Sequence, residues 1–370
     1  MEGGRAQSVS IISPVYRLWA LWLRVSWPVA DRLSLIKKPL LQLAFIHFAH
    51  WSLVTRMPQS APWRRGKRLT YPYVLFQSNF NDDLDAYIDA FALAVPERVW
   101  GMWGGVLRFP GPSPLKVFLQ YIKPRISEDA YYYCAYPDAS SSMITAALEL
   151  ERRVERFDEE AERLGDEGFL KRYQAFLAQS EKFMLSVALP YSPSAWGLWR
   201  RTPTSLIAMM PVRSGHQEEL ESALAGLPKD ESSPFADIES IHFARFTVLP
   251  ALLDGNREPL SSQAYLIFAA DFDGCLRSCL KSLRRHCAGA LNEVLQHCES
   301  YPGSTNRVQF ERYLRTHRIK PGFSVISYHA TVKEVKRALY LYDWVREFAT
   351  RHQAPRDDAE LRSEWLRRGF

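Results

Sequence analysis

Two histidines in a repeated tetrapeptide are the first candidates for chemistry. The sequence Ile-His-Phe-Ala occurs at residues 46–49 and again at 241–244, so His47 and His242 occupy equivalent positions. Imidazole titrates near neutral pH and binds metals, and each histidine could therefore be an acid, a base or a metal ligand. Both tetrapeptides lie in predicted strands, where alternate side chains share a face, so we expect His242 on the same face as Ala244. The alternative is a hydrogen-bonded, partly buried strand residue in each half.

A pair of tyrosines also occupies equivalent positions. Tyr136 and Tyr328 each lie at the end of the fourth predicted strand of their half. Such phenols could orient a ligand or carry an electron. The alternative is that they cover a sheet edge and hydrogen-bond locally, as buried tyrosines commonly do.

Thiols and imidazoles gather in the second half of the chain. Cys275 and Cys279 are four residues apart on a predicted helix, and two His-Cys pairs follow at 286–287 and 297–298. Thiolate and imidazole ligands would suit zinc, but the spacing matches no common zinc motif. A single helix also cannot easily surround a tetrahedral ion. We therefore predict no metal site here and expect the cysteines to pack as small buried hydrophobes.

The elements that must position these residues also occur twice. Residues of the first half return in the second at a spacing that changes by only a few positions. Four of them are Tyr73, Phe76, Phe80 and Leu84, which return as Tyr265, Phe268, Phe272 and Leu276. The correspondence continues through the Pro-Gly pairs at 110–111 and 302–303 to the last helix of each half. Such a long match indicates a tandem duplication.

Each half contains the same order of predicted elements. In the second half, strands are indicated at 205–210, 238–249, 264–270 and 323–328, with helices at 216–227, from 274 and from Thr331 to Phe348. The order strand, helix, strand, strand, helix, strand is a split βαβ unit, and an extra helix follows it. We predict an α+β fold: a tandem duplication of a ferredoxin-like βαββαβ unit with an extra C-terminal helix, whose two antiparallel sheets face each other.

The predicted organisation follows the duplication. Residues 1–160 form the first ferredoxin-like repeat, and residues 161–200 form a helical connection. Residues 201–352 form the second repeat, and residues 353–370 form a polar C-terminal tail. Each half is long enough to bury a core of its own.

Composition and missing motifs narrow the function classes. The chain has 370 residues, 47% of them hydrophobic, and a net charge of +6. The densest basic run, at 64–68, is interpreted as a solvated loop, so no nucleic-acid partner is predicted. The sequence lacks a phosphate loop, a dinucleotide glycine motif, Gly-x-Ser-x-Gly and His-Glu-x-x-His, which argues against nucleotide enzymes, α/β-hydrolases and the commonest metalloproteases. Five cysteines without a secretory signal predict free thiols and a cytoplasmic location.

The N-terminal segment is rich in Trp and Leu. Residues 15–29 contain Arg17, Arg24 and Pro28, and no apolar run reaches the ~18 residues that a membrane span requires. The match with the second half indicates a strand and a helix of the first repeat rather than a targeting segment. An amphipathic helix that lies on a membrane is the alternative.

The element order resembles that of the dimeric α+β barrel superfamily in a fused, single-chain form. This superfamily includes dye-decolorizing peroxidases, chlorite dismutases and cofactor-free monooxygenases. The segment Ala-Asp-Phe-Asp-Gly at 270–274 is also similar to the Gly-x-x-Asp-Gly motif of dye-decolorizing peroxidases, with Ala270 in place of the first glycine. The likeness concerns topology and one short motif, and a fold does not by itself fix a function.

The resemblance implies a role for each remaining candidate residue. Asp273 would be the acid on the distal side of a haem, with Arg245 beside it, and the axial ligand would be His317, His329 or His242. The alternative for the Asp-Gly pair at 273–274 is a helix cap followed by a turn.

Three functions stay open at this point. The first is a haem-dependent, peroxidase-like oxidoreductase that acts on a hydrophobic or aromatic small molecule in an apolar pocket between the repeats. The second is a non-catalytic protein that binds a hydrophobic ligand, a lipid surface or a protein partner, with peripheral membrane contact through the N-terminal helix. The third is a cofactor-free enzyme of the α+β barrel type. Association into a homo-oligomer is compatible with all three.

Overall fold

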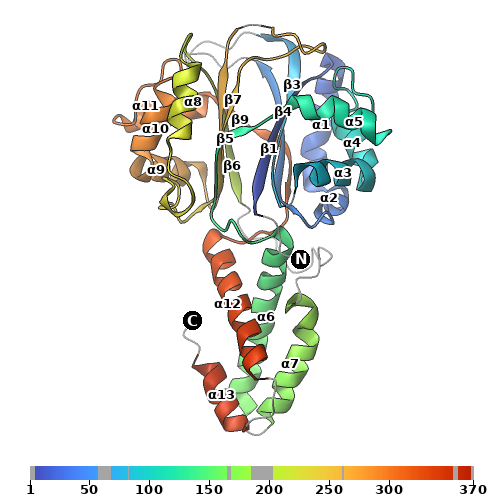
Figure 1. Ribbon diagram of the computed structural model, residues 1–370, viewed down its shortest axis with the longest axis vertical. Helices are drawn as coiled ribbons and strands as arrows, with labels where there is room; N and C mark the ends of the chain where they lie inside the picture. Colours follow the sequence, from blue (N-terminus) through green and yellow to red (C-terminus); the bar gives the residue numbers. More distant parts are fainter. Residues whose placement is uncertain are drawn as a thin grey trace.

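Two five-stranded antiparallel sheets stand face to face at the centre of the molecule (Figure 1). The computed structural model describes residues 5–56, 68–81, 83–164, 168–184, 203–260, 262–352 and 357–367. The predicted mixture of helices with two facing antiparallel sheets is confirmed. The sheets stay separate within the described residues, so the closed barrel that the resemblance implied is not formed.

The two sheets share one strand order. The first sheet is β10-β2-β3-β1-β4, with β10 (Pro321–Ile326), β2 (Ile46–Arg56), β3 (Arg68–Phe80), β1 (Gln7–Pro14) and β4 (Ile126–Ser127). The second sheet is β5-β7-β8-β6-β9, with β5 (Asp129–Cys134), β7 (Ile241–Leu249), β8 (Tyr265–Phe272), β6 (Thr204–Pro211) and β9 (Arg318–Ile319). Four strands of the first sheet therefore follow the order of their counterparts in the second.

Each sheet is completed by a strand from the other half of the chain. β10 pairs with β2, with Val325 opposite Ala49, and β5 pairs with β7, with Tyr133 opposite Ala244. The two halves thus exchange their last long strands. Neither sheet is built from one half, although the repeats follow one another in the sequence.

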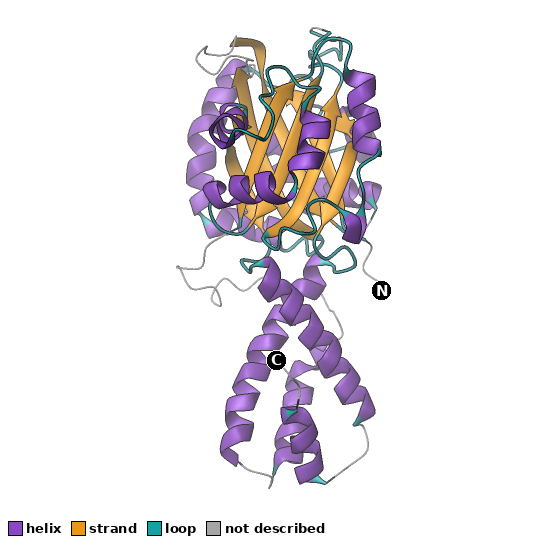
Figure 2. Cartoon of the chain, turned by 90° about the vertical axis from the view of Figure 1, so that its left-hand side faces the viewer, coloured by secondary structure: helices purple, strands orange, loops and turns teal. Residues whose placement is uncertain are grey.

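Helices cover the outer face of each sheet (Figure 2). The first sheet is covered by α1 (Arg17–Arg32), α2 (Ser34–Leu41), α3 (Leu84–Ala94), α4 (Pro96–Trp103) and α5 (Leu115–Ile122). The second sheet is covered by α8 (Gln217–Ala225), α9 (Leu276–His286), α10 (Ala288–Leu295) and α11 (Arg307–Thr316). The molecule therefore has the layers helix, sheet, sheet, helix.

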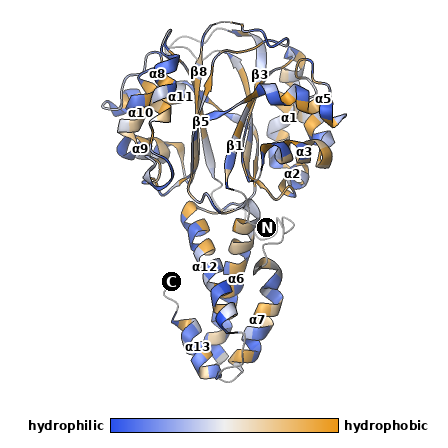
Figure 3. Ribbon diagram, in the orientation of Figure 1, coloured by the Kyte–Doolittle hydropathy of each residue, from blue (hydrophilic) through white to orange (hydrophobic). Residues whose placement is uncertain are grey.

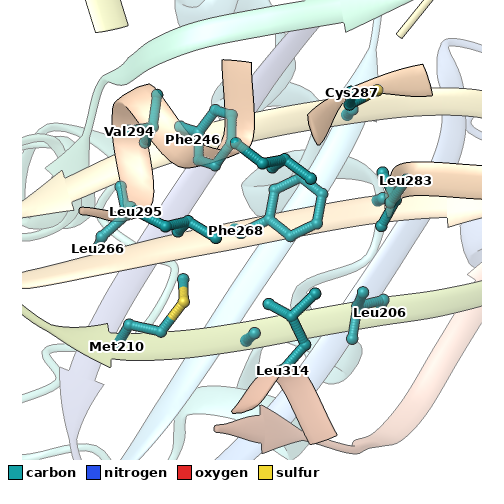
Figure 4. Close-up of a cluster of buried hydrophobic side chains, with 14 of the residues drawn as sticks. Leu206, Met210, Phe246, Leu266, Phe268, Leu283, Cys287, Val294, Leu295 and Leu314 are labelled. Atoms are coloured by element: carbon teal, nitrogen blue, oxygen red, sulfur yellow. The ribbon is translucent and has the colours of Figure 1, made fainter. Parts of the chain in front are cut away.

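Strand side chains alternate between a helix-side core and a core between the sheets. On β3, Val74 and Phe76 pack toward the helices, whereas Leu75 packs toward the second sheet. Phe246 and Phe268 lie in the helix-side core of the second sheet (Figure 4). Burial on both faces explains why these strands contain so few exposed residues.

Four further helices project from one end of the sheets, and both hydrophilic and hydrophobic residues lie along them (Figure 3). They are α6 (Ser141–Leu164), α7 (Phe169–Met184), α12 (Val332–Arg351) and α13 (Asp358–Leu366). The helix predicted from Thr331 is confirmed, and Thr331 with Glu334 forms a capping box at the start of α12. α7 lies in the predicted connection, of which residues 165–167 and 185–200 lie outside the described part.

The segment predicted as a polar tail contains a packed helix. α13 buries Leu361 and Trp365, which are four residues apart and so share one face of the helix. Trp365 packs against Phe157 and Phe176 of the same bundle, and its indole N–H donates to Asp158 at 2.8 Å. Two apolar residues at helical spacing are thus enough to anchor an otherwise polar segment.

Candidate functional site

The repeated histidines lie at β-bulges, and this changes the direction of their side chains. The pairing of β2 with β3 shifts between Ile46 and Phe48, and that of β7 with β8 shifts between Ile241 and Phe243. A bulge inserts one residue and breaks the simple alternation of faces. The prediction that His242 shares a face with Ala244 is wrong for this reason. Ala244 packs in the helix-side core, whereas the His242 ring hydrogen-bonds to Tyr136 and Asp273 outside that core.

A continuous chain of hydrogen bonds joins the two histidines. His47 Nδ1 lies 2.9 Å from the Tyr328 hydroxyl, which lies 2.8 Å from the Tyr136 hydroxyl. The Tyr136 hydroxyl lies 2.6 Å from His242 Nδ1, and His242 Nε2 lies 2.9 Å from Asp273 Oδ1. Five of the eight candidate site residues predicted from the sequence therefore meet in one place; the other three are Arg245, His317 and His329. We call them the histidine–tyrosine chain.

The ends of the histidine–tyrosine chain attach the helical bundle to the sheets. The backbone N–H of Val332, the first residue of α12, donates to Asp273 Oδ2 at 2.9 Å. At the equivalent place in the first half, the N–H of Ser141, the first residue of α6, donates to Asn81 Oδ1 at 2.9 Å. Asp273 thus interacts with a helix N-terminus, a site that favours a carboxylate. This helix is α12. It is not α9, the helix that follows Asp273 in the sequence and begins after Cys275.

Four of the five residues of the histidine–tyrosine chain are closed to solvent, and the side chain of the fifth, Asp273, is 18% exposed. His47, His242 and Tyr328 are fully buried, and Tyr136 is nearly so. Burial lowers the pKa of His47 to about 3 against the opposing effect of the Asn81 side chain, and it raises the pKa values of Tyr136 and Tyr328 well above their usual range. His47 and both tyrosines are therefore uncharged near neutral pH, which suits a buried hydrogen-bonded connection.

A second buried network lies between the sheets and contains Arg245. Its guanidinium donates to Ser78 O at 3.0 Å, to Val9 O at 3.3 Å and to Asn79 Oδ1 at 3.1 Å. It also lies 3.7 Å from Asp129, which accepts hydrogen bonds from Ser8, Ser10 and Thr247. A single cation thus holds polar groups of both sheets.

The Arg245 network continues to a pair formed by an aspartate and a histidine. Asn79 Nδ2 donates to Asp271 Oδ2 at 2.9 Å, and Asp271 Oδ1 lies 2.8 Å from His50 Nε2. His50 Nδ1 lies 2.9 Å from the Ser324 hydroxyl. Burial raises the pKa of Asp271, but His50 and Arg245 outweigh it, so the pKa of this carboxyl is lowered overall.

Sequence reasoning missed Asp271, Asn79 and Ser324 as members of a site. The signal was present in the repeat: His50 aligns with Arg245, and Asn79 aligns with Asp271. Each pair contacts the other across the two halves, as His50 with Asp271 and Arg245 with Asn79. Polar residues that occupy equivalent strand positions in the two halves, with apolar neighbours in the sequence, were therefore a signal of the interface between the halves.

The two remaining haem-ligand candidates lie apart from these networks. His317 is buried at the end of α11, where its ring lies 4.4 Å from that of Tyr313 and its Nδ1 lies 2.9 Å from Tyr313 O. His329 is partly buried in the loop between β10 and α12. A pocket of about 660 Å³ does lie between the halves, but its lining includes none of the eight candidate residues.

These positions do not fit a haem. Neither His242 nor His317 faces an open cavity, and Asp273 and Arg245 are engaged in separate networks. Among the described residues, no group of three or more His, Cys, Asp or Glu side chains is arranged to hold a metal ion. The haem remains a prediction from the sequence, which an absorption spectrum combined with iron analysis tests.

The cysteines of the second half do not form a cluster of thiolates. Cys279, Cys287 and Cys298 are buried in the helix-side core, and Cys275 is exposed. Burial raises the pKa values of Cys287 and Cys298 to about 12, so these thiols stay protonated. The expectation that they pack as small buried hydrophobes is confirmed for Cys279, Cys287 and Cys298 and is wrong for Cys275, which is exposed.

A group of apolar side chains on the outer face of α1 is exposed to solvent. Ala20, Leu23 and Trp27 of this helix pack on the first sheet. The opposite side, which faces solvent, is also apolar, and its exposed residues are Leu18 (85% exposed), Leu21 (60%), Trp22 (47%), Val25 (66%) and Val29 (55%). We call these five residues the apolar face of α1. Contiguous exposed apolar residues of this kind mark an interaction site.

Basic residues border the apolar face of α1. Arg17, Arg24 and Arg32 are exposed on α1, and Lys38 is exposed on α2. The one acidic residue of these two helices, Asp31, lies 2.8 Å from Lys37 and accepts from the Ser324 N–H at 2.9 Å. The surface that α1 and α2 present is therefore apolar and positively charged.

No protein-family model matches the chain, and a search of curated proteins finds no match. No family is assigned. The functional conclusion consequently depends on the surface and its chemistry.

Proposed function

We propose that this protein is a peripheral membrane protein that docks on an anionic lipid surface through α1 and α2. The observation that carries the proposal is the apolar face of α1, which is exposed although the opposite side of the same helix is packed on a sheet. Within the described residues, no helix is both long and apolar enough to cross a bilayer. Contact with the surface of a membrane is thus the kind of membrane association that the described helices support.

The composition of the apolar face of α1 suits the boundary between headgroups and acyl chains. An amphipathic helix in this position lies in the plane of the interface with its apolar side inserted. Leu18, Leu21 and Val25 supply aliphatic surface, and Trp22 supplies an indole, which prefers the interfacial region. Trp100 on the neighbouring α4 is half exposed and adds a second indole.

The charge around the apolar face favours an anionic surface. A basic residue close to an anionic leaflet contributes about 1 kcal/mol of binding free energy, and the contribution decreases with salt. Arg17, Arg24, Arg32 and Lys38 are the exposed cations of α1 and α2. The carboxylate of Asp31 is already bound by Lys37 and Ser324.

A second copy of this chain is a poorer occupant of the same face. A symmetric dimer would bring identical patches together, and the exposed arginines of both copies would meet without exposed acids on α1 or α2 to pair with. Unpaired like charges disfavour an interface. An anionic lipid surface satisfies the same cations.

The docking prediction concerns Leu18→Glu combined with Leu21→Glu. Both side chains are exposed, so the fold is expected to be unchanged. Losing two inserted leucines and adding two negative charges should weaken binding to vesicles of phosphatidylcholine and phosphatidylserine by about 3 kcal/mol, or about 100-fold. Co-sedimentation with vesicles at increasing lipid concentration measures this change.

The matched control is Leu260→Glu combined with Val308→Glu. These residues are exposed in the second half of the chain and give the same change in charge, with a smaller loss of exposed apolar surface. We expect this control to bind vesicles like the unchanged protein. Equal binding by both double variants, or no preference for phosphatidylserine at low salt, would contradict docking through α1.

We also propose that the fold arose by tandem duplication of a ferredoxin-like unit. The shared strand orders β2-β3-β1-β4 and β7-β8-β6-β9 support this view. So do the bulges at His47 and His242 and the equivalent contacts of Asn81 and Asp273 with helix N-termini.

A further inference from the structure

We propose that the pocket beside α1 holds the acyl chain of a single-chain lipid with an anionic headgroup. This inference rests on the proposed docking function, because it gives the docking surface a ligand. The pocket has a volume of about 410 Å³ and lies between α1, α2 and α4, above Phe323 of β10. Its size falls in the range of about 300–1,000 Å³ that is usual for small-molecule sites.

The pocket opens on the surface that is proposed to meet the membrane. Trp22, Val25 and Val29 line it and also belong to the apolar face of α1. Deeper in the pocket, Trp27 and Met102 are buried. The acyl chain of a lipid that left the membrane beside α1 would therefore pass from one apolar environment to another.

Arg98 and Ser26 in the lining are suited to a headgroup, although the exposed carboxylate of Glu97 lines the same pocket. Arg98 is partly buried and, within the described residues, makes no ion pair with a carboxylate. The Ser26 hydroxyl is buried and has no hydrogen-bond partner in the described structure. A guanidinium binds carboxylate or phosphate through charge-assisted hydrogen bonds, so an anionic headgroup at the rim is the ligand group that Arg98 favours.

The test fills the pocket without touching the apolar face of α1. Gly101 lines the pocket in the middle of α4, and a Cβ at this position would meet no atom within 4 Å. Gly101→Leu therefore has room, and leucine also favours a helix more than glycine does. The matched control is Gly289→Leu on α10, where a Cβ also has open space and none of the pockets described above is near.

The probes are oleate and lysophosphatidylglycerol, titrated by calorimetry into the full chain below their critical micelle concentrations. We expect saturable binding of one molecule per chain, a loss of about tenfold or more in affinity for Gly101→Leu, and no change for Gly289→Leu. Arg98→Gln should weaken the binding of oleate more than the binding of uncharged monooleoylglycerol. Binding of oleate but not of lysophosphatidylglycerol identifies a free fatty acid as the source, and binding of both extends it to membrane lipids.

The two proposals fail in different ways. If neither lipid binds the unchanged protein, or if Gly101→Leu binds as tightly as the unchanged protein, the pocket proposal is overturned. Loss of vesicle binding by Leu18→Glu/Leu21→Glu with oleate binding retained supports both proposals. If the unchanged protein binds oleate but no vesicles, the pocket proposal stands and the docking proposal falls.

Discussion

Replacing Arg245 by methionine is expected to cost about 3–5 kcal/mol of the free energy of unfolding, because it leaves buried polar groups without their cation. Only 2% of the Arg245 side chain is exposed. Its loss would leave Ser78 O and Val9 O without this donor and would remove the positive charge beside Asp129. Methionine fills similar space, so the effect reports the charge and hydrogen bonds rather than a cavity.

Urea denaturation followed by circular dichroism measures the effect of Arg245→Met. The matched control is Arg307→Met, which removes an exposed arginine at 3.6 Å from Glu311 on α11. An exposed pair of this kind contributes about 0–1 kcal/mol, so the control should change stability little. A loss below about 1 kcal/mol for Arg245→Met would mean that water or rearranged side chains replace the guanidinium.

Acidification is expected to destabilise the protein through His47, with an effect of about 3 kcal/mol between pH 6.5 and pH 4.5. Burial holds the pKa of folded His47 at about 3, below the 6.5 of an ordinary histidine. Below pH 6.5 the unfolded chain therefore binds a proton that the folded chain does not bind until pH approaches 3. Stability is highest above this window and decreases by about 1.4 kcal/mol per pH unit as the pH falls through it.

The comparison that isolates His47 uses His47→Gln. Glutamine retains a hydrogen-bonding group toward Tyr328 but does not titrate. Its unfolding free energy should be lower at pH 7, yet it should change less with acid, so that the two curves approach each other toward pH 4.5. Other buried histidines with lowered pKa values, His317 and His329, contribute equally to both proteins. Parallel curves would show that His47 is already protonated in the folded state or is solvated.

The repeated residues of the sequence made much of the fold predictable. Apolar runs ending at Pro211 and before Asp273 predict β6 and β8 closely, and Thr331 predicts the start of α12. The exchange of β5 and β10 was not predictable, because strand partners far apart in the sequence leave no trace in local periodicity. The helix in the predicted tail was missed because it is short and buries only Leu361 and Trp365, while most of its other residues are polar or charged.

The positions of the candidate residues were less predictable than their pairing. The repeat identified His47 with His242 and Tyr136 with Tyr328 as equivalent residues, but it did not predict that they lie in one hydrogen-bonded chain, and the bulges reversed the expected face of His242. The sequence of α1 has large apolar residues on two opposite sides of the helix. Which side contacts the sheet depends on tertiary packing, and only the packed structure identifies Leu18 and Val25 as exposed.

The exchanged strands also bear on how the chain is made. A ribosome releases β2 early, but the strand that covers its outer edge, β10, emerges only when residues 321–326 have been synthesised. Until then the first half of a nascent chain has an unpaired β2 edge, which is a template for association with other chains. Folding of the first sheet must therefore wait for nearly the whole protein, and ribosome-bound fragments that end before residue 321 should be the species that require a chaperone.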